Sequence, residues 1–267
     1  MKGRVLVVAG SDSGGGAGMQ ADIKTVTALG GYAATALTAL TAQNTEGVAG
    51  IHDVPAEFVA QQMRVVLSDI GADCVKTGML HRADIIDAVC DVLEAEAEGV
   101  PVVVDPVMVA KGGASLITEA AMARLKERMI PLATVLTPNA PEAEALSGLR
   151  LRHAEDAAEV VGALAALGPK VVLVKGGHME GNEVTDMVFE GGEEVARFES
   201  ERLDTTSTHG TGCTMASAIA TGIAQGLAIV DAVARAHRYV HEAIRGAPGF
   251  GRGHGPLDHG HTVRPFE

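Results

Sequence analysis

Short β-branched runs alternate along the chain with longer alanine-rich stretches of helical period, and this alternation constrains the fold more than any other feature. We expect strands at residues 4–9, 35–40, 74–77, 102–104, 134–136 and 171–174, and helices at residues 19–29, 56–68, 83–98, 119–129, 141–146, 155–167, 211–225 and 230–245. Such alternation predicts right-handed crossovers and a central, mostly parallel sheet with helices on both faces. The sequence therefore predicts an α/β fold in three layers.

The alternation breaks once, at two consecutive strand-like runs, residues 184–189 and 195–198. A Glu-Gly-Gly-Glu segment at residues 190–193 joins them, which is typical of a hairpin with a tight glycine turn. We expect this small antiparallel pair at one edge of the parallel sheet. No internal repeat or low-complexity linker divides the chain, so residues 1–267 are interpreted as a single domain.

Charge and composition narrow the function classes. The chain has 21 Lys and Arg against 34 Asp and Glu, a formal charge of -13, which disfavours binding to nucleic acid or anionic lipid. No apolar run approaches the roughly 20 residues of a membrane span, and the run at residues 4–9 is too short for a signal-peptide core. The three cysteines lack CxxC spacing, which argues against a disulfide framework or a zinc site. We expect a cytoplasmic protein.

A glycine-rich segment, SDSGGGAG at residues 11–18, directly follows the first expected strand. Its glycines and the helix that follows would let backbone amides approach a ligand. A dinucleotide site is disfavoured because GxGxxG is only loosely present, with Met19 at the sixth place, and no acidic residue ends the second strand. A plain glycine turn is the structural alternative. A loop that binds a small molecule is the preferred interpretation.

Three polar groups follow other expected strands, where parallel sheets concentrate their chemistry. Asp105 comes after residues 102–104 and suits a metal or catalytic carboxylate, or a turn before proline. Asn139 and Glu142 fit a capping box, which would explain both without any ligand. Lys175 precedes two glycines and suits phosphate contact, although a solvated lysine at a turn is equally ordinary.

The segment STHGTGC at residues 207–213 precedes a helix of small residues. Glycines at a helix N-terminus leave amides pointing outward at the positive end of the helix dipole, where they could hold a transferring phosphoryl group. A cysteine in the first turn, Cys213, is expected to have a lowered pKa there. The structural alternative is a small buried cysteine that packs the helix.

Taken together, these segments resemble the ribokinase-like superfamily, and more closely the hydroxymethylpyrimidine/phosphomethylpyrimidine kinases of thiamine biosynthesis. The matching segments are VAGSDSGGGAGMQADIKT, TALTAQNT, VKTGML, VVDPVMVAKGG, LTPNAPEAEAL, VLVKGGH, HGTGCTMASAIA and the later GHGP. They run in order from residue 7 to about residue 256. One such motif would be weak, but eight in order are specific.

The resemblance implies a ribokinase-like fold with the active site across the carboxyl ends of the strands. It implies transfer of the γ-phosphoryl group of ATP, with Mg²⁺, to 4-amino-5-hydroxymethyl-2-methylpyrimidine and then to its monophosphate. It also implies a homodimer.

By the same resemblance, each site residue takes a role. The pyrimidine pocket would be formed by Asp12, Gly16, Ala17, Gly18, Asp22, Gln43, Met79 and Val107, the nucleotide contacts by Asn139, Lys175 and Thr208, the metal site by Asp105 and Glu142, and the catalytic anion hole by Gly210, Thr211, Gly212 and Cys213.

The wider superfamily usually has an aspartate base at the position of Cys213. The pyrimidine kinases and a similar group of pyridoxal kinases have cysteine there, as this chain does. A pyridoxal kinase of that type is therefore the nearest alternative, and a non-catalytic pyrimidine-sensing domain is an alternative from another class. The histidines show no metal-ligand spacing, and we expect His254, His259 and His261 to face solvent.

Overall fold

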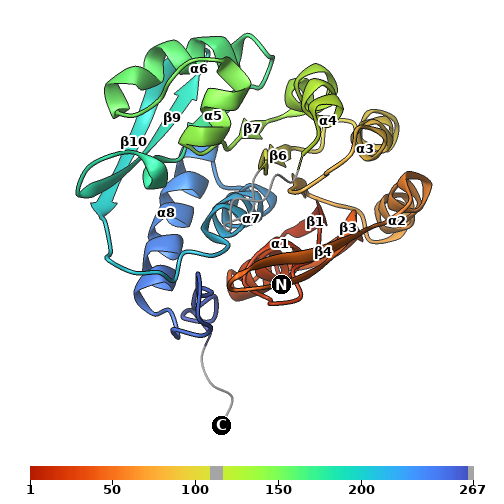
Figure 1. Ribbon diagram of the computed structural model, residues 1–267. Helices are drawn as coiled ribbons and strands as arrows, with labels where there is room; N and C mark the ends of the chain where they lie inside the picture. The colour runs from red at the N-terminus through yellow and green to blue at the C-terminus, as the bar shows by residue number, and fades with distance from the viewer. Residues whose placement is uncertain (109–116, 264–267) are drawn as a thin grey trace.

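The structure is a computed structural model that describes residues 1–108 and 117–263. Eight strands form its main sheet, in the order β10-β9-β8-β7-β6-β5-β1-β2 (Figure 1). Their bounds are β1 Arg4–Ala9, β2 Tyr32–Leu37, β5 Cys74–Thr77, β6 Val102–Val104, β7 Val135–Leu136, β8 Val171–Val174, β9 Glu183–Glu190 and β10 Glu193–Glu201. Strands β1, β2 and β5 to β8 pair in parallel, whereas β9 and β10 are antiparallel at the edge, as predicted.

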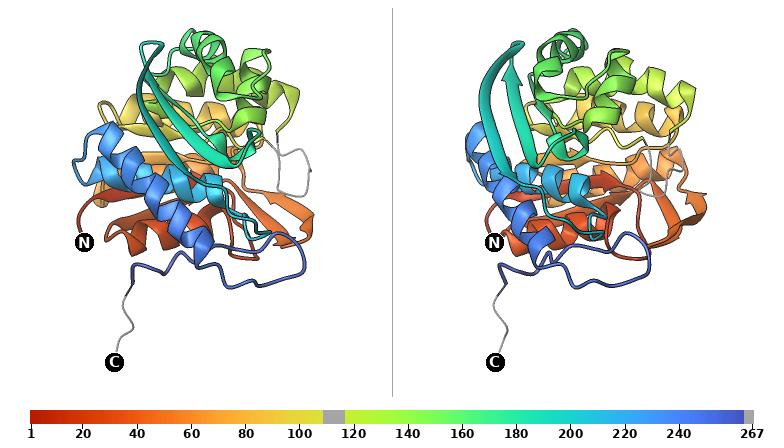
Figure 2. Two further views of the ribbon diagram at one scale, coloured as in Figure 1. Left: turned by 90° about the vertical axis from the view of Figure 1, so that its left-hand side faces the viewer. Right: turned by 60° about the vertical axis from the view of Figure 1, so that its left-hand side comes forward.

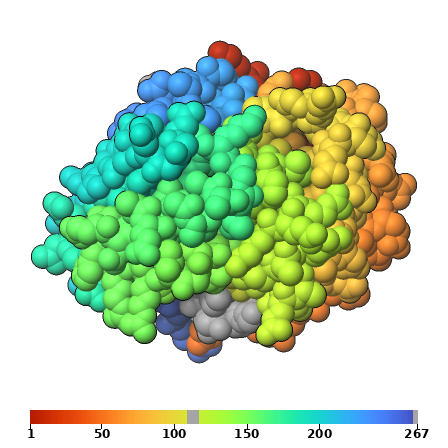
Figure 3. Space-filling model, turned by 90° about the horizontal axis from the view of Figure 1, so that it is seen from above, coloured from red at the N-terminus to blue at the C-terminus, as the bar shows by residue number. Residues whose placement is uncertain are grey.

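Helices cover both faces of the sheet (Figures 1 and 2). They are α1 Gly18–Ala28, α2 Ala56–Asp69, α3 Ala83–Glu96, α4 Glu119–Arg124, α5 Ala140–Ser147, α6 Ala157–Ala165, α7 Thr211–Ala224 and α8 Ile229–Arg245. One apolar cluster packs α2 to α6 against the sheet, and a second packs α1, α7 and α8 against the other face. The expected three-layer α/β architecture is confirmed. Seen from above, the edge hairpin with α5 and α6 fills one side of the molecule, opposite α2 and α3 (Figure 3).

The expected strand at residues 35–40 is wrong at its C-terminal end. Strand β2 ends at Leu37, and a separate two-stranded sheet follows, made of β3 (Ala39–Asn44) and β4 (Gly47–Asp53). The alternation of apolar residues is weak there because most side chains of this hairpin are exposed or only partly buried. Residues 47–53 were not expected to form a strand for the same reason.

One smaller departure occurs in a helix. The helix expected at residues 119–129 becomes α4 followed by a π-helical turn, Leu125–Met129.

No helix within the described ranges has the length and apolarity to cross a membrane.

Candidate active site

A cavity of about 730 Å³ lies across the carboxyl ends of the parallel strands. The segments that follow β1, β5, β6 and β8 contribute Asp12, Met79, Asp105 and Lys175 to its lining. The N-terminal turn of α7 contributes Gly210 to Cys213. This is the expected location, since parallel strands all present their carboxyl ends at one edge of the sheet.

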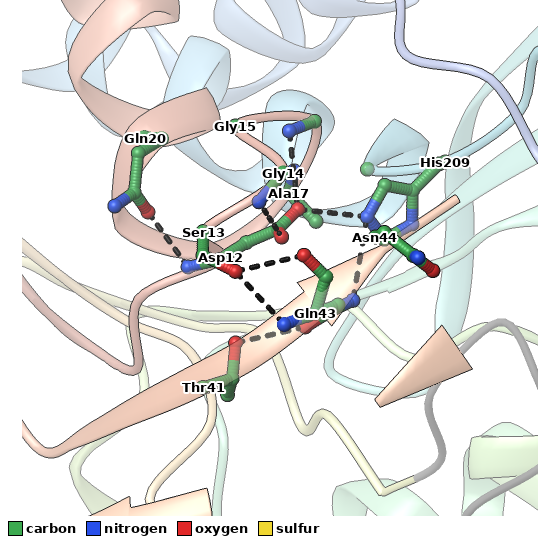
Figure 4. Close-up of polar contacts among 12 residues, drawn as sticks. Asp12, Ser13, Gly14, Gly15, Ala17, Gln20, Thr41, Gln43, Asn44 and His209 are labelled. Carbon is green, nitrogen blue, oxygen red and sulfur yellow. Dashed lines mark hydrogen bonds and ion pairs between the residues drawn. The ribbon is translucent and has the colours of Figure 1, made fainter. Parts of the chain in front are cut away.

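The glycine-rich loop is organised around Asp12. The Asp12 carboxylate accepts hydrogen bonds from the backbone N–H groups of Gly14, Gly16 and Ala17, at 2.8, 3.1 and 2.8 Å, and lies 2.8 Å from His209 Nε2 (Figure 4). Burial disfavours its charge, but the hydrogen bonds from His209 and from the Ala17 amide outweigh that effect and hold the pKa of Asp12 below its ordinary value. Asp12 therefore lines the cavity as the residue that shapes the loop.

Most of the residues expected in the substrate pocket line one end of the cavity, namely Asp12, Ala17, Gly18, Gln43, Met79 and Val107. Gly16 is buried and does not line it. A Cβ at Gly16 would lie 2.6 Å from Cδ2 of His209, so glycine is needed there for the His209 ring to approach the loop. Gly16 thus leaves room for the side chain of His209, a residue that the sequence analysis did not identify as part of the site.

Asp22 requires a correction. It was expected to contact substrate, but it is fully buried and does not line the cavity. Its carboxylate lies 2.9 Å from Lys76 Nζ and accepts a 2.6 Å hydrogen bond from Ser217. Lys76 is also fully buried, yet it reaches the cavity wall. Burial works against its charge, but Asp22 outweighs burial and raises the pKa of Lys76, which keeps a positive charge near Cys213 in the first turn of α7.

A second buried ion pair lies at the middle of the cavity. Lys175 Nζ is 2.8 Å from Asp105 Oδ1 and 3.8 Å from Glu142 Oε2. Asn139 and Glu142 form the capping box of α5, as the sequence predicted. Both residues also line the cavity. Burial raises the pKa of Glu142 to about 7, against the opposing charge of Lys175. One lysine therefore bridges two carboxylates at the cavity floor.

The backbone of residues 210–213 is free to face a ligand. Gly210 has φ +85°, and a Cβ there would collide with the carbonyl oxygen of Gly16, so glycine is required. A Cβ on Gly212 would come within 3.2 Å of Lys175 Nζ, which places this amide segment beside the lysine. Helix α7 has no side-chain cap, so its first amides remain available to an anion. Thr208 and Thr211 line the cavity on either side of Gly210.

The expected lowering of the Cys213 pKa is wrong. Cys213 lines the cavity, but burial raises the pKa of its thiol to about 12, and Asp22 and Asp105 add to the rise while Lys76 opposes it. The helix N-terminus was expected to favour a thiolate. Two buried carboxylates and the loss of solvent outweigh it.

The segment after α8 packs against His209 and the first turns of α7. The backbone of His209 donates to the carbonyl of Gly255 at 3.1 Å and forms an isolated parallel bridge with Pro256. His259 was expected to face solvent, but it is buried and lies 3.0 Å from Thr214 Oγ1 in the first turns of α7. Burial lowers the pKa of His259 to about 4, so it packs there as a neutral ring. His254 is exposed, as expected, whereas His261 is only partly exposed.

The far end of the cavity contains a histidine that sequence reasoning missed. His237 Nδ1 lies 2.8 Å from Asp186 Oδ2, and the other oxygen of Asp186 accepts the N–H of Gly176 at 2.9 Å. The pair therefore fixes the backbone directly after Lys175. The two residues are 51 positions apart in the chain, so the sequence alone does not indicate that they are in contact.

Within the described ranges, no three His, Cys, Asp or Glu side chains gather closely enough to hold a metal ion by themselves. Asp105 and Glu142 supply two carboxylates at the cavity floor. That donor set suits Mg²⁺, which usually keeps several waters and binds through one or two carboxylates together with phosphate oxygens.

Comparison with known proteins gives one family. The model of the phosphomethylpyrimidine kinase family matches residues 12–258. A thiamine biosynthesis bifunctional protein of Geobacter sulfurreducens is 55% identical over 97% of this chain, which spans 52% of that protein's length. A hydroxymethylpyrimidine/phosphomethylpyrimidine kinase of Streptomyces coelicolor is 46% identical, over 96% of this chain and 94% of its own length.

Solved structures give the same fold. A phosphomethylpyrimidine kinase from Clostridium difficile superposes with a TM-score of 0.80 at 38% identity, covering 91% of this chain and 100% of its own. A pyridoxal kinase from Staphylococcus aureus in complex with ADP superposes with a TM-score of 0.90 at 34% identity, covering 99% of this chain and 96% of its own.

Proposed function

The chain belongs to the phosphomethylpyrimidine kinase family, and from that membership we propose that it phosphorylates 4-amino-5-hydroxymethyl-2-methylpyrimidine with ATP, first to the monophosphate and then to the diphosphate. The observation that carries the proposal is the layout of one cavity. Its glycine-loop end carries Gln43, and its floor carries Lys175 beside the amides of residues 210–213. The groups that we assign to the ring and those that we assign to the phosphates thus line one cavity.

The acceptor end suits a flat aminopyrimidine. Met79 and Val107 supply apolar surface for the ring, and the Gln43 amide offers both a donor and an acceptor to its polar edge. The hydroxymethyl arm would then point toward residues 210–213.

The phosphoryl step needs positioning and charge neutralisation. The hydroxymethyl oxygen forms a bond to the γ-phosphorus of ATP as the bond from that phosphorus to the ADP oxygen breaks. The amides of residues 210–213 and the ammonium group of Lys175 stabilise negative charge on the group in transit. Thr208 and Asn139 line the same cavity, and we assign them to the nucleotide.

Asp105 and Glu142 would hold Mg²⁺ through its waters, and the ion would supply charge neutralisation at the polyphosphate. Lys175 already pairs with both carboxylates, so it partly balances their charge before any nucleotide arrives.

Cys213 enters the reaction as a neutral thiol, since its pKa is about 12. We propose that it contacts the acceptor hydroxyl without removing the proton beforehand. The hydroxyl proton leaves late, once the new oxygen–phosphorus bond has acidified it, and passes to a phosphate oxygen or to water.

Pyridoxal phosphorylation is the second candidate, because solved pyridoxal kinases share the fold with TM-scores of 0.88 and 0.90. The relatives of higher identity carry the pyrimidine kinase name, at 44–46% over at least 95% of this chain, and they favour the first candidate.

A coupled ATP-consumption assay with product masses tests the proposal. The chain should convert the hydroxymethylpyrimidine to products one and two phosphates heavier, with a higher kcat/KM than for pyridoxal. Lys175→Ala should reduce kcat, while Asp105→Asn and Glu142→Gln should raise the Mg²⁺ concentration needed for half-maximal rate. Turnover of pyridoxal alone, or no turnover of either ring, would refute the proposal.

We also propose that the chain works in the cytoplasm as a homodimer. Leu40, on the β3–β4 hairpin, is 44% exposed and would contribute apolar surface to the contact with a second copy. Sedimentation velocity tests the dimer, and a monomer at micromolar concentration would contradict it.

A further inference from the structure

Three side chains from distant segments meet at the acceptor end of the cavity: Asp12 from the glycine-rich loop, Gln43 from β3, and His209 from the segment before α7 (Figure 4). His209 Nε2 lies 2.8 Å from Asp12 Oδ2 and 3.4 Å from the atom placed as Gln43 Nε2. Thr41 Oγ1 lies 3.2 Å from the atom placed as Gln43 Oε1. The two ends of an amide have the same shape, so its hydrogen-bond partners decide which end is oxygen.

The His209 contact requires the amide oxygen on its side. Asp12 accepts three backbone N–H groups in the same loop, which is the environment of an ionised carboxylate. His209 Nε2, at 2.8 Å from that carboxylate, must therefore carry a proton and donate it. A nitrogen that donates in this way has no lone pair for an amide N–H, so the neighbouring end of Gln43 must be its oxygen.

The Thr41 contact independently requires the amide nitrogen on the opposite side. The Thr41 hydroxyl donates its single proton to the carbonyl of Ser11 at 2.8 Å. Toward Gln43 it can then act only as an acceptor, and an amide N–H is the group that satisfies it. Both neighbours therefore require the amide to be turned over from its placement in the structure, with Oε1 toward His209 and Nε2 toward Thr41. Each amide atom keeps one further hydrogen-bonding position for a ligand.

The orientation matters because the two candidate substrates present hydrogen-bond donors and acceptors in opposite order along the ring edge. Next to the carbon that bears the hydroxymethyl arm, the aminopyrimidine has an amino donor and then a ring-nitrogen acceptor. Pyridoxal has an aldehyde acceptor at the first of these places and a hydroxyl donor at the second. An amide free to turn over would satisfy either edge, whereas an amide held in one orientation satisfies only one of them.

We propose that His209 is a positioning residue for substrate specificity: with Thr41 it locks the Gln43 amide in the orientation that matches an aminopyrimidine and mismatches pyridoxal. The ring of His209 is itself held by Asp12, and the backbone of the same residue is held by the carbonyl of Gly255. This inference rests on the proposed function, which supplies the preferred ring.

Two substrates and four variants test it. The ratio of kcat/KM for the hydroxymethylpyrimidine to that for pyridoxal is measured in the wild type, His209→Leu, His209→Gln and Thr41→Val. His153→Leu is the matched control, because His153 is exposed and lies outside the cavity lining. Thermal unfolding of each variant is recorded alongside.

His209→Leu should lower the ratio about ten- to a hundredfold, the cost of one mismatched polar contact, by losing pyrimidine activity while retaining or gaining pyridoxal activity. Thr41→Val should shift it in the same direction, because it releases the other end of the amide. His209→Gln keeps an N–H donor at the same reach and should recover part of the ratio, and His153→Leu should leave it unchanged.

Equal losses on both substrates in His209→Leu and Thr41→Val would overturn the lock and leave a purely structural role. If His209→Leu does not fold, an unchanged ratio in a folded Thr41→Val overturns it equally. A wild type that prefers pyridoxal refutes the proposed function itself, and with it the assignment of the locked amide to the aminopyrimidine edge.

Discussion

Replacing Cys213 with alanine tests how the acceptor hydroxyl loses its proton. The thiol pKa is about 12, so at pH 7 roughly one molecule in 10⁵ carries a thiolate. Forming that thiolate first costs about 7 kcal/mol, five pKa units at 1.36 kcal/mol each. A general base contributes about 10²–10⁴-fold, or roughly 3–5 kcal/mol. Because the cost exceeds the gain, Cys213→Ala should keep kcat within about tenfold of the wild type.

Single-turnover rates from pH 6 to pH 9 supply the assay, since they isolate phosphoryl transfer from product release. A required thiolate with this pKa would raise the wild-type rate about tenfold per pH unit over that range, and Cys213→Ala would remove the slope. We expect no such slope. Cys213→Asp, which can ionise at much lower pH, is the comparison variant. A loss of 10²-fold or more in Cys213→Ala, together with a wild-type slope near one, would refute this reasoning.

Three further changes probe separate parts of the site. Gln43→Ala should raise KM for the pyrimidine about ten- to a hundredfold and leave KM for ATP nearly unchanged, and equal effects on both would show that Gln43 is misplaced. Glu142→Gln should keep the α5 cap, because an amide oxygen can still accept the N–H of residue 139, yet need more Mg²⁺; denaturation and Mg²⁺ titrations separate the two effects. Asp22→Asn should lower the free energy of unfolding by about 3–5 kcal/mol, because Lys76 is left as an unpaired buried charge; urea unfolding measures this, and a loss below about 1 kcal/mol would contradict it.

The sequence predicts the main sheet well because its strands are buried on both faces. Val102–Val104 is apolar throughout, and every residue of it is buried, so the run itself identifies the strand. The β3–β4 hairpin lacks that signal, since the apolar Leu40 is exposed on one face of β3 and the polar Thr41 is buried on the other. A strand is predicted from alternating apolar and polar residues, and this prediction fails where the buried residues are not the apolar ones.

The candidate site divides in the same way. Asp105 and Lys175 follow strands directly, so fold class alone brings them to one edge of the sheet. The pairing of Lys76 with Asp22 joins residues 54 positions apart, and neither spacing nor composition marks it. The error over the Cys213 pKa has the same origin, because a helix N-terminus is visible in sequence whereas the buried carboxylates around it are not.

The backbone contact between His209 and the Gly255–Pro256 segment has a consequence for biosynthesis. During translation the glycine-rich loop emerges from the ribosome long before residues 255–256, so His209 meets this backbone partner only after those residues have emerged. The sheet and its helices can assemble earlier, since their packing does not involve that segment. A nascent chain released before residue 255 would therefore lack the partner that holds the His209 backbone beside the glycine-rich loop, and we expect cleavage within residues 246–256 to weaken the same support.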